Sequence, residues 1–163
     1  MSDKEKSFTS LVRLHEQTIY SLCLMYSSDS QEVEDLVQQT LINLWAGFDK
    51  FEGRSDIKTW IWRVAINTCI SEQRKEKHRV MTSPLESIGI SVNELVSENS
   101  KEKQISMLYG RIHRLGIYDR AIVLLWLENQ TYEEIGKIMG MTSQNVGMRL
   151  MRIREKLMNM SND

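Results

Sequence analysis

Residues 131–157 read TYEEIGKIMGMTSQNVGMRLMRIREKL, and their pattern predicts two short helices joined by a tight turn. Thr131 followed by Glu134 forms a capping box, which favours a helix start at this point. Gly140 stands where the turn requires a left-handed residue, and Thr142 can cap the second helix. The apolar positions of that second helix recur at helical spacing and are Val146, Leu150, Ile153 and Leu157. The stretch therefore has the layout of a helix-turn-helix.

The opposite side of the second helix carries residue types that suit DNA. A recognition helix contacts bases through its N-terminal residues and phosphates along its length. Gln and Asn can read adenine, whereas Arg reads guanine or binds phosphate. The candidate DNA contacts are Thr142, Gln144, Asn145, Met148, Arg149, Met151, Arg152 and Lys156. The alternative is an amphipathic hairpin with a solvated basic face, because the two methionines are poor phosphate ligands unless they contact thymine methyl groups.

The charge of the chain favours DNA binding only locally. The full sequence has a formal net charge of −1 and a pI near 6.3. Residues 105–163 hold 8 basic and 6 acidic side chains, whereas residues 80–104 hold 2 and 4. A single basic face is sufficient to attract DNA, so a neutral total does not exclude binding. It does predict weak non-specific binding by the isolated chain.

The composition predicts an all-α protein and gives no sign of an enzyme. The 163 residues include one proline and eight glycines, and β-branched runs are few. No apolar run is long enough to span a membrane, and the N-terminus MSDKEKSF lacks an apolar signal core, so we expect a cytoplasmic protein. Cys23 and Cys69 lack metal-ligand spacing and are expected to be small buried hydrophobes. We expect no metal, cofactor, catalytic residue or small-molecule substrate.

Residues 7–79 carry three helical patterns that predict a compact bundle. Asp29 followed by Glu32 can start the second helix, and Ser55 or Asp56 can cap the third after the turn at Gly53. The three apolar stripes are Phe8, Leu11, Val12, His15, Ile19, Leu22, Cys23 and Tyr26; Val33, Leu36, Val37, Thr40, Leu41, Leu44, Trp45 and Phe48; and Ile57, Trp60, Ile61, Val64, Ala65 and Thr68.

The chain is expected to hold two small helical domains joined by a flexible linker. Residues 1–79 form the first domain, and residues 105–163 form the second, where Ile105, Leu108, Ile112 and Leu115 make one helix face. Residues 80–104 contain Pro84 and five serines, and their periodicity is poor. We therefore interpret residues 80–104 as the linker.

Two sequence blocks resemble the extracytoplasmic-function (ECF) group of bacterial RNA polymerase sigma factors. The stretch that begins at Trp126 and ends at Leu157 is similar to the family's C-terminal pattern gxSyeEIAeilgiSvgTVksRlxRAReKL. Residues 29–75 resemble its N-terminal domain through DLVQQT…LW…F…G…KTW…R.A.NT, in order and at family spacing. The chain departs from the pattern at Gly147 and Met148, and has Leu115-Gly116 where Leu-Pro is usual. These departures leave the preferred −35 sequence open.

The resemblance implies a promoter-specificity subunit that is active only with core RNA polymerase. Its N-terminal domain would bind the β′ clamp helices and open the −10 element, and its C-terminal domain would bind the −35 element and the β flap. An anti-sigma factor is a further expected partner. The residues implied in polymerase binding are Asp35, Gln38, Gln39, Ile42 and Asn43. A solvated face with one stray isoleucine is the alternative for this strip.

The third helix and the loop before it would contact the opened −10 strand. The residues implied are Phe51, Arg54, Ser55, Trp62, Arg63, Asn67, Ser71, Arg74 and Lys75, with Lys77 as a further phosphate contact. Trp60 lies in the apolar stripe and is expected in the core. Trp62 points away from it, and could stack on an unpaired base or pack on the first helix. The loop could also be a capping turn, and the basic run could simply face solvent.

Two other functions are compatible with parts of the sequence. A stand-alone helix-turn-helix regulator with a helical effector domain would explain residues 131–157, but the N-terminal motif block argues against it. A helical adaptor without DNA binding would explain the bundle, but the two capped helices around the Gly140 turn argue against that.

Overall fold

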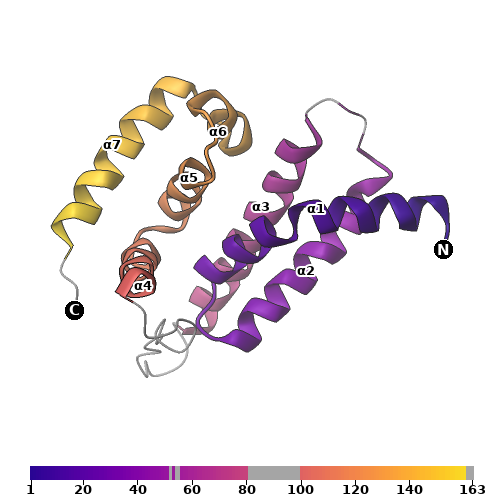
Figure 1. The fold of residues 1–163 in the computed structure, drawn as a ribbon, viewed down its shortest axis with the longest axis horizontal. Coiled ribbons are helices and arrows are strands. Elements are labelled where there is room, and N and C mark those ends of the chain that lie inside the picture. The colour runs from indigo at the N-terminus through magenta and orange to yellow at the C-terminus, as the bar shows by residue number, and fades with distance from the viewer. Residues whose placement is uncertain (52, 54–55, 81–99, 161–163) are drawn as a thin grey trace. The chain divides into compact units, whose positions relative to one another are not determined.

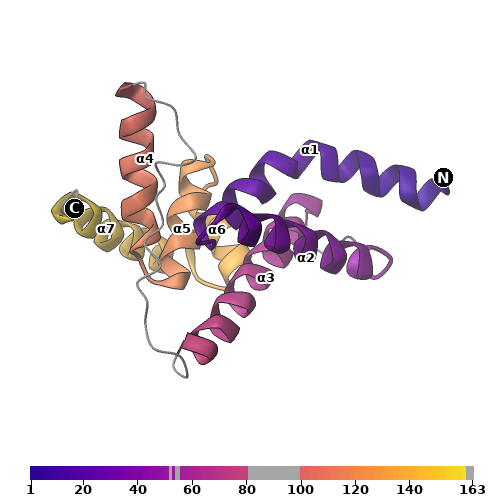
Figure 2. The same ribbon diagram turned by 90° about the horizontal axis from the view of Figure 1, so that it is seen from below.

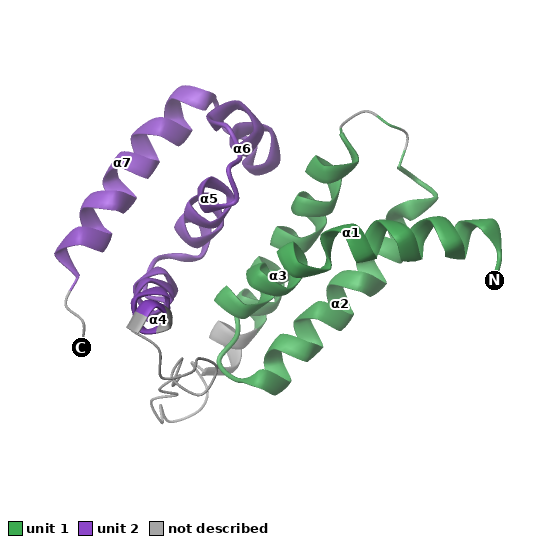
Figure 3. Cartoon of the chain, in the orientation of Figure 1, with its two compact units in different colours: residues 1–83 green, residues 84–163 purple. Residues whose placement is uncertain are grey.

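The fold was obtained as a computed structural model, which describes residues 1–51, 53, 56–80 and 100–160. Within these ranges the chain holds seven α-helices and no strand, so the all-α prediction is confirmed. The chain divides into two compact units, residues 1–83 and 84–163 (Figure 3). No helix in the described part of the chain is both long and apolar enough to cross a membrane.

Unit 1 is a three-helix bundle of α1 (Asp3–Met25), α2 (Ser30–Phe48) and α3 (Ile57–Val80), and each helix packs on the other two (Figures 1 and 2). Ser2 and Glu5 form a capping box that begins α1. The predicted cap of α2 is confirmed, because Asp29 Oδ1 accepts from Glu32 N at 2.8 Å and Glu32 Oε2 accepts from Ser28 N at 2.7 Å. The buried apolar side chains of α1 and α2 include Ile19, Leu22, Val33, Leu36 and Leu44.

The two cysteines lie at the centre of this bundle. Cys23 and Cys69 are fully buried free thiols whose Sγ atoms are 4.0 Å apart, and Cys23 Sγ also lies 3.9 Å from Thr40 Oγ1. The hydrogen bond to Cys23 and the burial of the thiol raise the pKa of Cys69 well above its ordinary value, so Cys69 stays protonated as the donor. The prediction that both residues act as small buried side chains is confirmed.

Unit 2 contains α4 (Ser100–His113), α5 (Ile117–Leu127), α6 (Tyr132–Met139) and α7 (Ser143–Asn159). Helices α5, α6 and α7 pack on one another, and α4 contacts α5 (Figure 1). Five consecutive residues of α5, Ala121–Leu125, are buried, so this helix forms the centre of the unit. The core is completed by Ile112, Leu115, Ile135, Ile138, Val146, Leu150 and Ile153.

The predicted face of α4 is only partly correct. Ile112 and Leu115 are buried, whereas Ile105 is 47% and Leu108 is 37% exposed. Leu115 lies beyond the end of α4, in the turn that leads to α5, so it does not continue a helical stripe. The helix also begins at Ser100 rather than at Ile105. Its first turn is polar and carries no apolar periodicity, so the sequence pattern did not indicate this start.

Candidate functional site

The turn between α6 and α7 has the geometry that the sequence predicts. Thr131 Oγ1 accepts from Glu134 N at 3.1 Å, and Glu134 Oε2 accepts from Thr131 N at 3.4 Å. Gly140 ends α6 with φ of 71°, a left-handed conformation that a residue with a Cβ adopts at a cost. Thr142 Oγ1 then accepts from Asn145 N at 3.2 Å and begins α7. Both helices of the helix-turn-helix are therefore held by the predicted caps.

The outward side of α7 is a continuous exposed surface. Val146, Leu150 and Ile153 face the core of unit 2, and Leu157 is half-buried. The predicted DNA contacts that are exposed are Thr142, Gln144, Asn145, Met148, Met151, Arg152 and Lys156, with Met148 46% and Met151 60% exposed. This surface combines amide, thioether and cationic groups, so it offers hydrogen bonds, apolar contact and positive charge to one ligand.

Arg149 differs from the other cations of α7. Its Nη2 lies 3.4 Å from Asp119 Oδ1 on α5, and its Nη1 lies 4.0 Å from Met141 Sδ. The Arg149 side chain is 42% exposed and that of Asp119 is 18% exposed. Sequence reasoning missed this ion pair, because the two residues are 30 positions apart and only the packing of α5 on α7 brings them together.

The C-terminal half of α7 borders an open depression of about 650 Å³. Arg152 and Lys156 line it from α7, and Arg114 lines it from the turn after α4. The remaining lining residues are Glu155, Asn159 and Met160. Three cations and one carboxylate give the depression a positive balance. Arg114 was absent from the predicted site, because it precedes the helix-turn-helix by about 17 residues in the sequence.

The predicted polymerase-binding strip lies along α2. Its residues form two groups, one exposed and one half-buried. Asp35, Gln38 and Ile42 are exposed, and Ile42 is 54% exposed although it is apolar. Asp35 Oδ1 accepts from Gln31 Nε2 at 3.1 Å, one turn earlier on the same exposed surface. Gln39 and Asn43 are half-buried and turn toward α3, where Asn43 Nδ2 donates to Thr68 Oγ1 at 2.9 Å. We call Asp35, Gln38 and Ile42 the α2 outer face.

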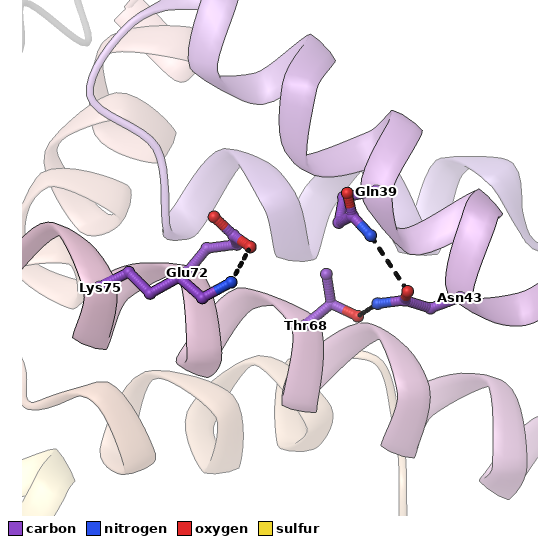
Figure 4. A network of polar contacts seen from close by, with 5 residues as sticks. All are labelled: Gln39, Asn43, Thr68, Glu72 and Lys75. Carbon is purple, nitrogen blue, oxygen red and sulfur yellow. Dashed lines mark hydrogen bonds and ion pairs between the residues drawn. The ribbon is translucent and has the colours of Figure 1, made fainter.

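The exposed polar residues of α3 lie beside that strip. Arg63, Asn67, Ser71, Arg74 and Lys75 are all exposed, and we call Asn67, Ser71 and Lys75 the α3 polar face. A groove of about 420 Å³ separates the two helices, and its lining includes the α3 polar face together with Gln39 and Asn43 of α2. Lys75 Nζ lies 3.4 Å from Glu72 Oε1 at one end of the groove (Figure 4). The structure therefore brings α2 and α3 side chains into one polar groove.

The burial of the two tryptophans of α3 differs from the core prediction for Trp60 and agrees with the packing alternative for Trp62. Trp62 is 2% exposed, and its Nε1 has no hydrogen-bond partner among the described residues. Trp60 is half-buried, with its ring 5.2 Å from that of Phe51 between centroids. Because α1 and α2 both pack on α3, its buried surface is wide enough to include Ile61, Trp62, Ala65 and Ile66. In this structure the Trp62 ring is therefore inside the bundle and does not present a surface for a base.

Three of the predicted −10 contacts cannot be placed. Arg54, Ser55 and the side chain of Lys77 lie outside the described residues. Phe51 is half-buried against Trp60, and Gly53 has φ of 71°, as expected of a turn residue.

No group of three or more metal-ligating side chains occurs among the residues that the structure describes.

Comparison with known proteins matches both units to named families. The sigma-70 region 2 model matches residues 11–79, and the sigma-70 region 4 model matches residues 106–157. The chain is similar to the ECF RNA polymerase sigma factor SigW of Bacillus subtilis, with 26% identity over 94% of this chain and 88% of that protein. It is also similar to the ECF RNA polymerase sigma-E factor of Escherichia coli, with 29% identity over 95% and 86%.

Two solved structures share the fold. The sigma factor RpoE of Bartonella quintana, in complex with the anti-sigma factor NepR, aligns with a TM-score of 0.75 and 25% identity over 93% of this chain and 94% of that chain. CnrH, in complex with the cytosolic domain of CnrY, aligns with a TM-score of 0.69 and 17% identity over 94% and 86%. The second similarity is one of fold alone.

Proposed function

The chain belongs to the sigma-70 family of RNA polymerase sigma factors, in its ECF group, and we propose that its two units have separate functions in promoter recognition. The protein directs RNA polymerase to promoters, which is a binding function rather than a catalytic one. Residues 1–79 bind core polymerase and open the −10 element, residues 105–163 recognise the −35 element, and residues 80–104 connect them. The observation that carries this proposal is the presence of both family regions in one chain, each within its own compact unit.

The α2 outer face is the proposed docking surface for the polymerase β′ clamp helices. Its exposed isoleucine offers apolar contact, and Asp35 and Gln38, which precede it on α2, offer side-chain hydrogen bonds. Gln39 and Asn43, which the sequence places in the same strip, turn toward α3 and are not part of this proposed docking surface. An anti-sigma protein that covered this face would block polymerase binding. The relative from Bartonella quintana was solved in complex with an anti-sigma factor. The β flap is the proposed polymerase partner of the second unit.

The α3 polar face, with Arg63 and Arg74, is the proposed contact for the opened −10 strand. Amide and hydroxyl groups can hydrogen-bond to the edges of unpaired bases, and lysine and arginine can bind phosphates. On unit 2, the exposed surface of α7 is the proposed reader of the −35 element, with Gln144 and Asn145 near base edges and Arg152 and Lys156 on phosphates.

Reconstitution with core polymerase tests the proposal. The wild-type protein should co-purify with core enzyme and support specific initiation on fragments of the source genome that neither component initiates on alone. Asp35→Ala combined with Gln38→Ala should lose most of the core binding while unit 2 stays folded. Glu16→Ala combined with Gln17→Ala is the matched control, because both residues are exposed on α1, away from the α2 outer face. Unchanged co-purification of the α2 variant would exclude this docking surface.

A further inference from the structure

A continuous line of hydrogen bonds connects α2 to α3 across the floor of the polar groove (Figure 4). Gln39 Nε2 donates to Asn43 Oδ1 at 3.1 Å, and Asn43 Nδ2 donates to Thr68 Oγ1 at 2.9 Å. Thr68 Oγ1 in turn donates to the carbonyl of Val64 at 2.7 Å. Each donor in the line points in the same direction, from the half-buried Gln39 on α2 to the backbone of α3.

The side chain of Asn43 makes its hydrogen bonds within unit 1. Its Oδ1 accepts from Gln39 and its Nδ2 donates to Thr68, so both ends of the amide have partners within unit 1. A docking residue should instead offer its hydrogen-bonding groups to the partner protein. The sequence places Asn43 in the docking strip, but the geometry gives it a different use.

Thr68 was predicted only as part of the apolar stripe of the third helix, and not as a site residue. It is 5% exposed, and it directly follows Asn67 and precedes Ser71 by three positions. A helix is rigid over such a short distance, so the position of Thr68 sets the position of the α3 polar face. On α2, Asn43 directly follows Ile42 of the α2 outer face. The single bond between Asn43 and Thr68 thus joins two segments with different proposed partners.

We propose that Asn43 and Thr68 are positioning residues for promoter opening, and that their hydrogen bond fixes how the α3 polar face lies relative to the docked α2 outer face. This inference rests on the proposed function of the two faces. Neither residue needs to touch polymerase or DNA. Apolar packing alone leaves neighbouring helices some freedom to slide and rotate, whereas a part-buried directional bond favours one arrangement. Loss of the bond should therefore weaken strand opening more than it weakens polymerase binding.

Isosteric substitutions separate this role from simple packing. Thr68→Val keeps the volume and removes the hydroxyl, Thr68→Ser keeps the hydroxyl, and Asn43→Leu removes the amide at a half-buried site. Each full-length variant is assembled with core polymerase at saturating concentration. Affinity for core enzyme is measured first, and opening of a promoter fragment used by the wild-type holoenzyme is then followed by 2-aminopurine fluorescence in the −10 region.

Thr68→Val and Asn43→Leu should each lower the equilibrium for opening about fivefold, with core affinity within twofold of wild type. Thr68→Ser should restore opening. The double variant should be no worse than either single one, because the same bond is lost in all three. Additive losses, normal opening, or equal losses of core binding and opening would each overturn the inference.

Two controls keep the interpretation clear. If Thr68→Val does not fold, Asn43→Leu decides the question alone, by the same comparison of opening with core affinity. A wild-type protein that fails to bind core polymerase contradicts the proposed function rather than the positioning role of Asn43 and Thr68. That result is visible before any variant is compared.

Discussion

Arg149 Nη2 on α7 lies 3.4 Å from Asp119 Oδ1 on α5, so one of the cations expected to bind DNA is already paired with a carboxylate of its own domain. Arg152, in the next turn of α7, is exposed and lines the basic depression with Arg114 and Lys156. Arg149 and Arg152 therefore have different electrostatic surroundings, although both were predicted from the sequence as DNA contacts.

Arg152→Ala should weaken −35 binding more than Arg149→Ala does, and it should also change the salt dependence more. Loss of one phosphate contact lowers the slope of log K against log salt by about one unit. The Arg149 guanidinium interacts with Asp119 as well, so its removal should change the slope by less than that. Titration of a −35 duplex at four salt concentrations gives both slopes. Equal slopes for the two variants would show that the ion pair does not restrain Arg149 in the complex.

Gly140→Ala should destabilise unit 2. Gly140 has φ of 71° and a Cβ there would meet no atom within 4 Å, so the cost is conformational and amounts to about 1–2 kcal/mol. Thermal unfolding followed by circular dichroism measures it. Gly140→Asn is the matched variant, because asparagine tolerates the left-handed region and should lose less. A stability for Gly140→Ala equal to that of wild type contradicts this account of the turn.

Gly147→Ala should stabilise α7, but by less than the propensity difference of about 1 kcal/mol between glycine and alanine. A Cβ at this position would lie 3.2 Å from Cε2 of Tyr132, so the tyrosine ring must move slightly. In a Tyr132→Ala background the obstacle is absent, and Gly147→Ala should then give the full gain. Urea unfolding of the four proteins tests this, and identical gains in both backgrounds would rule out the contact.

Trp62→Ala should cost about 3–5 kcal/mol of stability, as expected for the loss of a fully buried aromatic side chain. Trp62 is 2% exposed, whereas Trp60 is half-buried, so Trp60→Ala should cost less. Denaturant unfolding of the full chain, monitored by far-ultraviolet circular dichroism, compares the two. A Trp62→Ala protein that keeps its stability but fails to open promoters would instead indicate that this ring stacks on a base.

The stability of unit 1 should decrease at mildly acidic pH, partly through His15. Burial lowers the pKa of His15 below its ordinary value of 6.5, and the nearby positive charge of Lys58 lowers it further, whereas Asp56 opposes both. Because the folded pKa is lower than the unfolded one, the unfolded chain takes up the proton first. Stability present above pH 6.5 is thus lost as pH falls through the folded pKa. His15→Gln should unfold with a weaker pH dependence between pH 7.5 and 5.5; an identical dependence would exclude His15 as a contributor.

The sequence alone determined the local structure. The caps at Asp29, Thr131 and Thr142 and the turn at Gly140 depend on hydrogen bonds and backbone angles within four residues, and all four were confirmed. The helical stripes of α1 and α2 were also predicted from their periodicity, except that Trp45 of the α2 stripe is 37% exposed. The two ordered motif blocks identified the family for the same reason, since they are patterns of neighbouring residues.

The tertiary structure decided which side chains meet across helices. The buried surface of α3 is wider than its predicted stripe and includes Trp62, which the packing of α1 and α2 against this helix decides. The pairing of Arg149 with Asp119 and the bond from Asn43 to Thr68 each depend on a neighbouring helix that is distant in the sequence. Periodicity shows which residues lie on the same side of one helix. These contacts depend instead on the distance and angle between the axes of two helices, and the sequence of one helix does not determine either quantity.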